Sequence, residues 1–252
     1  MDAPLDALRS SVARLRQLVE PLDDADLESA AYPSQWTVAD VLSHIGSGAV
    51  IFRRHLDDGL AGRPTPDDFA QSVWASWNSK LPRAQADDAL EADRALLERL
   101  DSLTDDEGSG FVFSLGTMSF DIGGFVRLRL NEHAFHTWDI EVAGNPAATI
   151  PAAPTAVVVD NLELVARFTA KPTGDTRLIA VRTTAPVRGF AIELTPDGVT
   201  LAPGSAPDKP DLELPAEAFA RLVYGRLDPD HTPVAQGDTA VIDTLRRIFP
   251  GP

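Results

Sequence analysis

Two stretches of the chain repeat their apolar residues at the three- and four-residue spacing of an amphipathic helix. The first runs up to Val19 and the second lies between Pro82 and Leu103. The residues that define these apolar faces are Leu5, Leu8, Val12, Leu15 and Leu18, and then Ala89, Leu90, Ala95, Leu96, Leu97 and Leu100. Both stretches are therefore predicted to be helices with one buried side.

Capping and breaking residues delimit two more helices. Thr37, followed by Asp40 three residues later, has the form of a capping box and predicts a helix over residues 37–60. Another is expected over residues 119–142, because Gly144-Asn145-Pro146 would end it. The weaker segments between them are a short helix at 69–77 and a loop at 105–110. Four long helices predict an antiparallel four-helix bundle.

The pattern changes after Pro146, where short strand-like runs alternate with turns rich in proline and glycine. The expected elements are a helix at 153–169, strands at 177–182, 190–194 and 211–214, a helix from 215 toward 224, and a last helix that Asp238 caps and that ends near Phe249. The predicted fold class is thus a two-domain α+β protein. The four-helix bundle would occupy residues 1–150 and a small α+β domain residues 151–252.

Composition narrows the classes of partner. The 252 residues are 44% hydrophobic and 24% charged, as expected of a globular protein with one large or two small cores. A net charge of −16 argues against nucleic acid, whose phosphates require concentrated Lys and Arg. The acidic opening lacks the signature of a signal peptide, and no apolar run of about 18 residues predicts a membrane span. We therefore expect a cytoplasmic protein without a membrane partner.

The chain contains no cysteine. Disulfides, thiolate metal ligands and a protein thiol nucleophile are therefore excluded. Any metal would be held by histidine and carboxylate side chains, and any thiol chemistry would need a thiol that arrives on a small molecule.

Polar residues form one stripe on the predicted fourth helix. Arg129, Glu132, His136 and Asp139 are spaced by three, four and three residues, which places them on one face. Their flanking residues are mostly apolar, so this helix is expected to be largely buried. Polar side chains on a buried helix must find partners inside the protein.

A similar stripe lies on the predicted second helix, at Asp40, His44, Ser47 and Gly48. Ser47 and Gly48 are small enough to leave room for a cofactor beside His44. If the two stripes face each other, His44, Glu132 and His136 supply three of the four ligands of a tetrahedral Zn²⁺. The open fourth position is typical of a catalytic site. The same ligands also suit Fe²⁺, Mn²⁺ or Ni²⁺.

The spacing alone leaves alternatives open. His44 and His136 could be ordinary half-buried histidines, bonded to Asp40 and Asp139 within their own helices. His133 could replace Glu132 as a ligand because it lies three residues before His136, but we expect it at the surface or rim. The two remaining histidines, His55 and His231, are expected to be structural or solvated.

The motifs resemble a known family. The segment Gln35-Trp-Thr-Val-Ala-Asp-Val-Leu-Ser-His44 is similar to the start of the second helix in DinB-like four-helix proteins. Together with Arg129-x-x-Glu132-x-x-x-His136-x-x-Asp139, it resembles the mycothiol-dependent maleylpyruvate isomerase family. In the second domain, Tyr224-Gly-Arg226 and Gly237-Asp238 also resemble that family.

The resemblance implies a zinc ion held by His44, Glu132 and His136, with mycothiol as cosubstrate. Zinc lowers the pKa of a thiol from about 8.5, which yields a thiolate nucleophile at neutral pH. In an isomerase the thiolate adds to an activated cis double bond and leaves after rotation. In an S-transferase it stays attached to the electrophile. The sequence does not separate these two reactions.

Roles for other polar residues follow from the same resemblance. Arg226 would pair with a substrate carboxylate, or else be a surface residue paired with Asp228 or Asp230. Arg129 would orient Glu132 or meet an anion, or else form a structural ion pair. The carboxylates of the two stripes, at positions 40 and 139, would orient the imidazoles.

The leading hypothesis is an enzyme that acts on a small electrophilic molecule with mycothiol, as a monomer by default. Two alternatives remain at this point. A DinB-like protein that binds a metal or small molecule without catalysis has the same scaffold. A metal-dependent hydrolase would use a zinc-bound water and no thiol.

Overall fold

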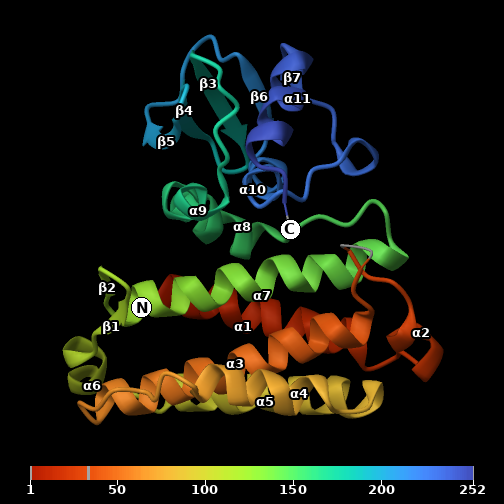
Figure 1. Ribbon diagram of the computed structural model, residues 1–252, viewed down its shortest axis with the longest axis vertical. Coiled ribbons are helices and arrows are strands. Elements are labelled where there is room, and N and C mark those ends of the chain that lie inside the picture. Colours follow the sequence, from red (N-terminus) through yellow and green to blue (C-terminus); the bar gives the residue numbers. More distant parts are fainter. Residues whose placement is uncertain (1, 33–34, 252) are drawn as a thin grey trace. The chain divides into compact units, whose positions relative to one another are not determined.

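The computed structural model describes residues 2–32 and 35–251, and these form two compact units that divide between Ala148 and Thr149 (Figure 1). The first unit is helical and the second contains a mixed five-stranded sheet with helices. This confirms the predicted α+β fold class. None of the helices in the described part of the chain has the length and apolarity needed to cross a bilayer.

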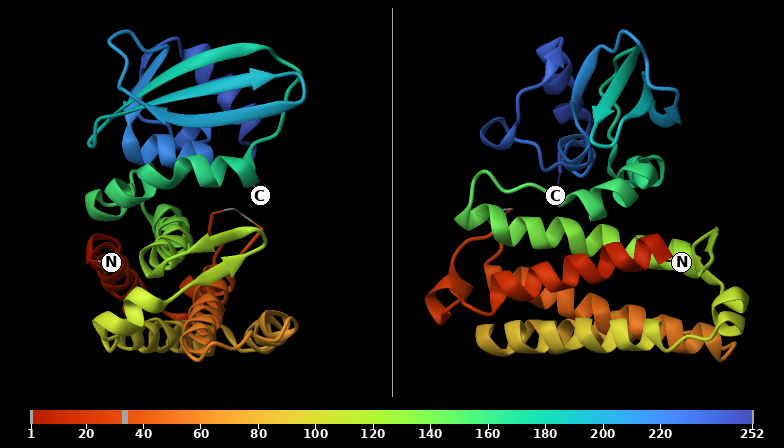
Figure 2. Two further views of the ribbon diagram at one scale, coloured as in Figure 1. Left: turned by 90° about the vertical axis from the view of Figure 1, so that its left-hand side faces the viewer. Right: turned by 180° about the vertical axis from the view of Figure 1, so that it is seen from behind.

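Four long helices build the first unit. They are α1 (Asp2–Val19), α3 (Val38–Leu60), α5 (Pro82–Asp101) and α7 (Ile122–Gly144). Helix α1 packs beside α7, and α3 packs beside α5 (Figures 1 and 2). Between α3 and α5, the shorter α4 (Phe69–Asn78) lies against α3. The four-helix arrangement is the one that the sequence predicted.

The start of α3 is fixed by the predicted capping box. The Thr37 hydroxyl accepts a hydrogen bond from the Asp40 backbone N–H (3.1 Å), and the Asp40 carboxylate accepts one from the Thr37 backbone N–H (2.9 Å). Two backbone donors that the helix leaves unpaired are thereby satisfied. The cap sets the helical phase at which His44 emerges two turns later.

Several short elements differ from the sequence analysis. Residues 105–110 form a helix, α6 (Asp105–Gly110), rather than a loop, because Thr104 and Glu107 make a second capping box. The short helix α2 (Asp24–Glu28) and the strands β1 (Phe113–Leu115) and β2 (Met118–Phe120) were not predicted. The two strands form a hairpin, so α7 begins at Ile122, later than expected.

The second unit is a sheet with the strand order β5-β4-β3-β6-β7. The strands are β3 (Arg177–Thr184), β4 (Arg188–Thr195), β5 (Gly198–Gly204), β6 (Leu212–Pro215) and β7 (Gln236–Gly237). Among the described strands of this sheet, β3 and β6 pair in parallel and the other neighbours are antiparallel. Neither β5 nor β7 was predicted, because β5 contains glycine and proline at an edge and β7 has two residues.

Helices of the second unit contact this sheet and one another (Figure 2). They are α8 (Ala152–Val158), α9 (Leu162–Thr169), α10 (Ala216–Val223) and α11 (Thr239–Ile248). The single helix expected over 153–169 is divided by a 3₁₀ turn at Val159–Asn161. Asp238 caps α11 as predicted, since its carboxylate accepts a hydrogen bond from the Ala240 backbone N–H (3.0 Å).

Candidate metal centre

Three side chains from two helices of the first unit converge. Glu132 and His136 lie one turn apart on α7, and His44 faces them from α3. The Nε2 atom of His44 lies 3.2 Å from Glu132 Oε2, and Nε2 of His136 lies 3.7 Å from the same oxygen. One ligand atom from each residue lies within 4.8 Å of the others. The two helical stripes therefore face each other.

These distances fit a small tetrahedral ion. Ligands about 2.1 Å from zinc at tetrahedral angles are separated by about 3.4 Å, close to the spacings of both imidazoles from Glu132. The side-chain exposed fractions are 35% for His44, 11% for His136 and 48% for Glu132, so the group is accessible from one side. Two nitrogens, one carboxylate and an open side make these residues a candidate metal-binding triad.

The protonation state of Glu132 suits a ligand. Its partial burial would raise the pKa of the carboxyl group. The hydrogen bonds and positive charge of His136 and His44 outweigh that effect and hold the pKa of Glu132 well below its ordinary value. A metal would thus meet a carboxylate at neutral pH, with no proton to displace from it.

Asp139 orients one of the imidazoles. Its fully buried carboxylate lies 2.8 Å from His136 Nδ1, which leaves Nε2 on the side of Glu132. Its backbone oxygen also accepts a hydrogen bond from the Tyr32 N–H (3.0 Å), so the segment that leads to α3 is attached to α7 at this residue. A carboxylate behind a ligating histidine fixes the ring and increases its basicity.

Asp139→Asn is expected to weaken zinc binding about 10- to 100-fold, because Asn keeps an acceptor oxygen but loses the charge behind His136. Competition with a chromophoric chelator measures the affinity, and circular dichroism checks that the helices persist. Glu141→Gln is the matched control. It removes another α7 carboxylate, one that accepts a hydrogen bond from Arg14 Nε (2.8 Å), and it should leave the affinity unchanged. Equal affinity in both variants would contradict the role of Asp139.

Asp40 has the capping role that the sequence predicted, and among the described residues no hydrogen bond joins it to the imidazole of His44. Its carboxylate accepts hydrogen bonds from the backbone N–H and hydroxyl of Thr37 and completes the helix cap. The hydrogen-bond partner of the His44 imidazole is Glu132, 88 residues away. The alternative in which His44 pairs only within its own helix is therefore wrong.

Arg129 occupies the structural ion pair that the sequence left as an alternative. Its guanidinium is 2% exposed and donates to Asp93 Oδ1 on α5 (2.7 Å) and to the Ile45 carbonyl on α3 (2.9 Å). A Cβ atom placed on Gly48 would lie 2.8 Å from Arg129 Nη1. The small size of Gly48 therefore makes room for this guanidinium, where we had expected space for a cofactor.

His133 is buried, so its expected position at the surface or rim is wrong. Its Nε2 lies 3.0 Å from Asp93 Oδ2, and its Nδ1 lies 2.8 Å from the Ser11 hydroxyl and 3.2 Å from that of Thr137. The imidazole is fully enclosed in the bundle and does not belong to the triad. The sequence signal for this cluster was Asp93 itself, a charged residue four positions after Ala89 on an otherwise apolar face.

A cleft adjoins the triad on the side of α3 and α4. It has a volume of about 570 Å³ and is lined by Trp36, Asp40, His44, Ser47, Trp74 and Asn78. Ser47, an expected cofactor residue, is buried and donates its hydroxyl to the His44 carbonyl (3.1 Å). The Trp36 indole stacks on His136 with 6.0 Å between ring centroids and lies 5.5 Å from the ring of His44. Neither tryptophan was assigned to the site from the sequence.

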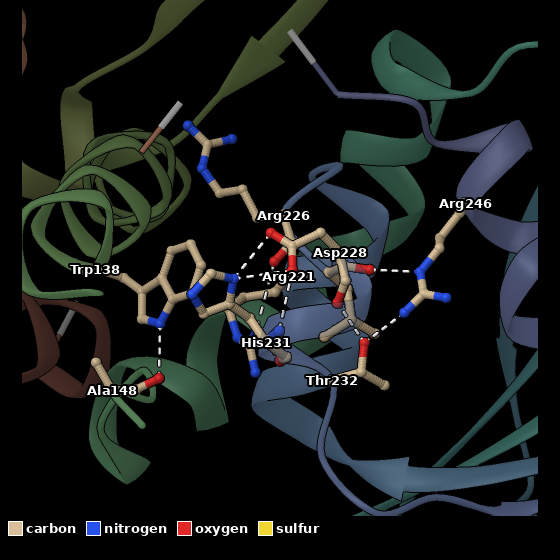
Figure 3. Close-up of polar contacts among 9 residues, drawn as sticks. Trp138, Ala148, Arg221, Arg226, Asp228, His231, Thr232 and Arg246 are labelled. Atoms are coloured by element: carbon tan, nitrogen blue, oxygen red, sulfur yellow. Dashed lines mark hydrogen bonds and ion pairs between the residues drawn. The ribbon is translucent and has the colours of Figure 1, made fainter. Parts of the chain in front are cut away.

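In the second unit, the expected site residue Arg226 is 6% exposed, so it is not a surface residue. Its Nη1 donates to the Tyr224 carbonyl (3.1 Å). Its pairing with a substrate stays a prediction. His231 lies 2.8 Å from the carboxylate of Asp228, and its carbonyl accepts a hydrogen bond from Arg221 Nη1 (3.0 Å), as Figure 3 shows. It belongs to a structural turn.

Comparisons with known proteins agree with this description. The family described as "Mycothiol maleylpyruvate isomerase N-terminal domain" matches residues 8–141, a range that contains the whole triad. The crystal structure of the mycothiol-dependent maleylpyruvate isomerase is similar over 88% of each chain, with a TM-score of 0.63 and 14% identity. A variant of that enzyme has the same coverage and TM-score at 13% identity. At such identity the likeness shows the fold. No curated protein sequence matches the chain.

Proposed function

The chain belongs to the mycothiol maleylpyruvate isomerase N-terminal domain family, and from that premise we propose that it is a mycothiol-dependent metalloenzyme. Its reaction would be an S-transfer or a cis–trans isomerisation of a small electrophile. The observation that carries the proposal is the convergence of His44, Glu132 and His136 with one side open. All three ligands come from one chain, so the proposed site is complete in a monomer.

The donor set fits zinc, and the three residues of the triad would hold it. A bound zinc ion would supply Lewis acidity that lowers the pKa of a thiol from about 8.5 toward neutrality. The chain itself prepares the ligands: Asp139 fixes the ring of His136, and the lowered pKa of Glu132 keeps its carboxyl group unprotonated. Because the chain contains no cysteine, the reacting thiol comes from the cosubstrate.

The two proposed reactions differ in what happens to the carbon–sulfur bond. In S-transfer the thiol sulfur bonds to the electrophilic carbon, the leaving group departs with the electron pair of its own bond, and the thiol proton is released. In isomerisation the carbon–sulfur bond forms, the former double bond rotates, and the bond then breaks to regenerate the thiolate. Both reactions need the same activated thiol, so they share one site.

The test is a turnover assay on purified protein supplied with zinc, mycothiol and a small electrophile. We expect thiol-dependent product, detected by mass spectrometry as a mycothiol adduct or as an isomerised substrate. Omission of mycothiol should abolish turnover. Product formed without any thiol would support a hydrolase and overturn the proposal. Retention of zinc with no mycothiol binding in calorimetry would overturn it in favour of a non-catalytic binding protein.

A further inference from the structure

We propose that the cleft beside His44 binds the electrophile, and that it selects a flat, conjugated, uncharged molecule. That the ligand is the reacting electrophile rests on the proposed function. That the cleft binds a ligand of this kind rests on the cleft alone. His44 belongs to both the triad and the lining of the cleft. A ligand in the cleft would therefore lie next to the candidate metal centre.

The walls of the cleft favour a flat ligand. Trp36 and Trp74 are 37% and 47% exposed, although large aromatic side chains gain free energy from burial. Both line the same concavity, whose volume of about 570 Å³ lies in the usual range for small-molecule pockets. Trp74 is on α4, which packs against α3, the helix that carries His44 and Ser47. A conjugated ring in this cleft would cover indole surface that is now exposed to water.

The polar groups of the cleft favour an uncharged ligand with an acceptor oxygen. The Ser43 hydroxyl donates to Asn78 Oδ1 (3.1 Å), so the amide NH₂ of Asn78 is the group left to donate to a carbonyl or nitro oxygen. Asp40 adds a carboxylate to the lining. Among the described residues that line the cleft there is no Lys or Arg. In the protein without metal, an anionic ligand would meet the Asp40 carboxylate with no Lys or Arg among these lining residues to offset the repulsion.

The binding test uses 1,3-dinitrobenzene, a flat, neutral molecule without a leaving group, in equilibrium dialysis against the full-length protein. Trp74→Ala is expected to raise its Kd about tenfold, because a stacking surface is lost. Leu115→Ala, which truncates another exposed apolar side chain of the first unit, should leave the Kd unchanged. Equal Kd values for wild type and Trp74→Ala would overturn the proposal.

Charge selectivity is tested with 3,5-dinitrobenzoate, the anionic counterpart of that probe. Wild type should bind it severalfold more weakly than dinitrobenzene. Asp40→Asn should reduce this difference in Kd, because it removes the negative charge from the lining, while Asn keeps an oxygen that can accept from the Thr37 N–H. Tighter binding of the anion by wild type would overturn the selection for uncharged ligands. Dialysis needs no thiol, so the two proposals can fail separately. If dinitrobenzene binds as expected but the turnover assay gives no mycothiol-dependent product, the proposed function alone is refuted.

Discussion

His136→Ala is expected to lose both zinc retention and thiol-dependent turnover. The substitution removes one of the three side chains that would bind the metal. The two that remain, one from each helix, would bind zinc much more weakly than three. The zinc affinity should fall further than in Asp139→Asn, where a loss of about 10- to 100-fold is expected. Elemental analysis of protein purified without chelator should give about one zinc per chain in wild type and none in the variant.

His55→Ala is the matched control for this experiment. His55 lies on α3, as His44 does, but its Nδ1 lies 3.1 Å from the Thr65 hydroxyl, outside the triad. This variant should keep its zinc and its turnover. His44→Ala should behave like His136→Ala. Full thiol-dependent activity in either triad variant would refute the metal-centred proposal.

Asp93→Ala is expected to lower the free energy of unfolding by about 3–5 kcal/mol, as the loss of one partner from a buried ion pair does. Asp93 is 1% exposed and accepts from both Arg129 and His133, so its removal leaves the Arg129 charge enclosed without a carboxylate. Urea unfolding measures the change. Asp88→Ala on the same helix breaks the exposed pair with Lys80 (2.9 Å, 52% exposed at Asp88) and should cost about 0–1 kcal/mol. Similar losses in both would contradict a central role for Asp93.

The same carboxylate predicts a pH dependence. Burial would raise the pKa of Asp93, but the charges of His133 and Arg129 outweigh it and lower the pKa below its ordinary value. A group with a lowered pKa in the folded state stabilises the protein above its unfolded pKa, about 3.9, and loses that contribution as the pH falls further. The stability gap between wild type and Asp93→Asn should therefore narrow below about pH 4.

The triad could be predicted because most of its geometry is local. Glu132 and His136 lie four residues apart, so a helix alone places them side by side. The capping box at Thr37 fixed the start of the helix that presents His44. What spacing could not supply was the pairing of α3 with α7, since that depends on packing between segments 88 residues apart. The family resemblance supplied it.

The errors at Arg129 and His133 have a common physical cause, which is that most residues of α7 are buried, although Glu132 on the same helix is 48% exposed. A stripe of polar residues on such a helix does not identify its buried face, because residues outside the stripe are buried as well. His133 was therefore placed at the rim, and Arg129 was considered for catalysis, while both in fact bond to Asp93 on another helix. Tertiary partners of this kind cannot be read from one segment.

The separation of His44 from Glu132 in the sequence gives the proposed ion a second effect. An ion held by both would act as a removable cross-link between positions 88 residues apart. Unfolding would have to break this cross-link or leave a closed loop in the unfolded chain. At free zinc 100-fold above its Kd, a ligand that binds only the native state adds about 2.7 kcal/mol of stability. The fraction of folded protein in a cell would then depend on the concentration of free zinc. A shortage of the metal would increase proteolysis of the chain as well as remove its activity.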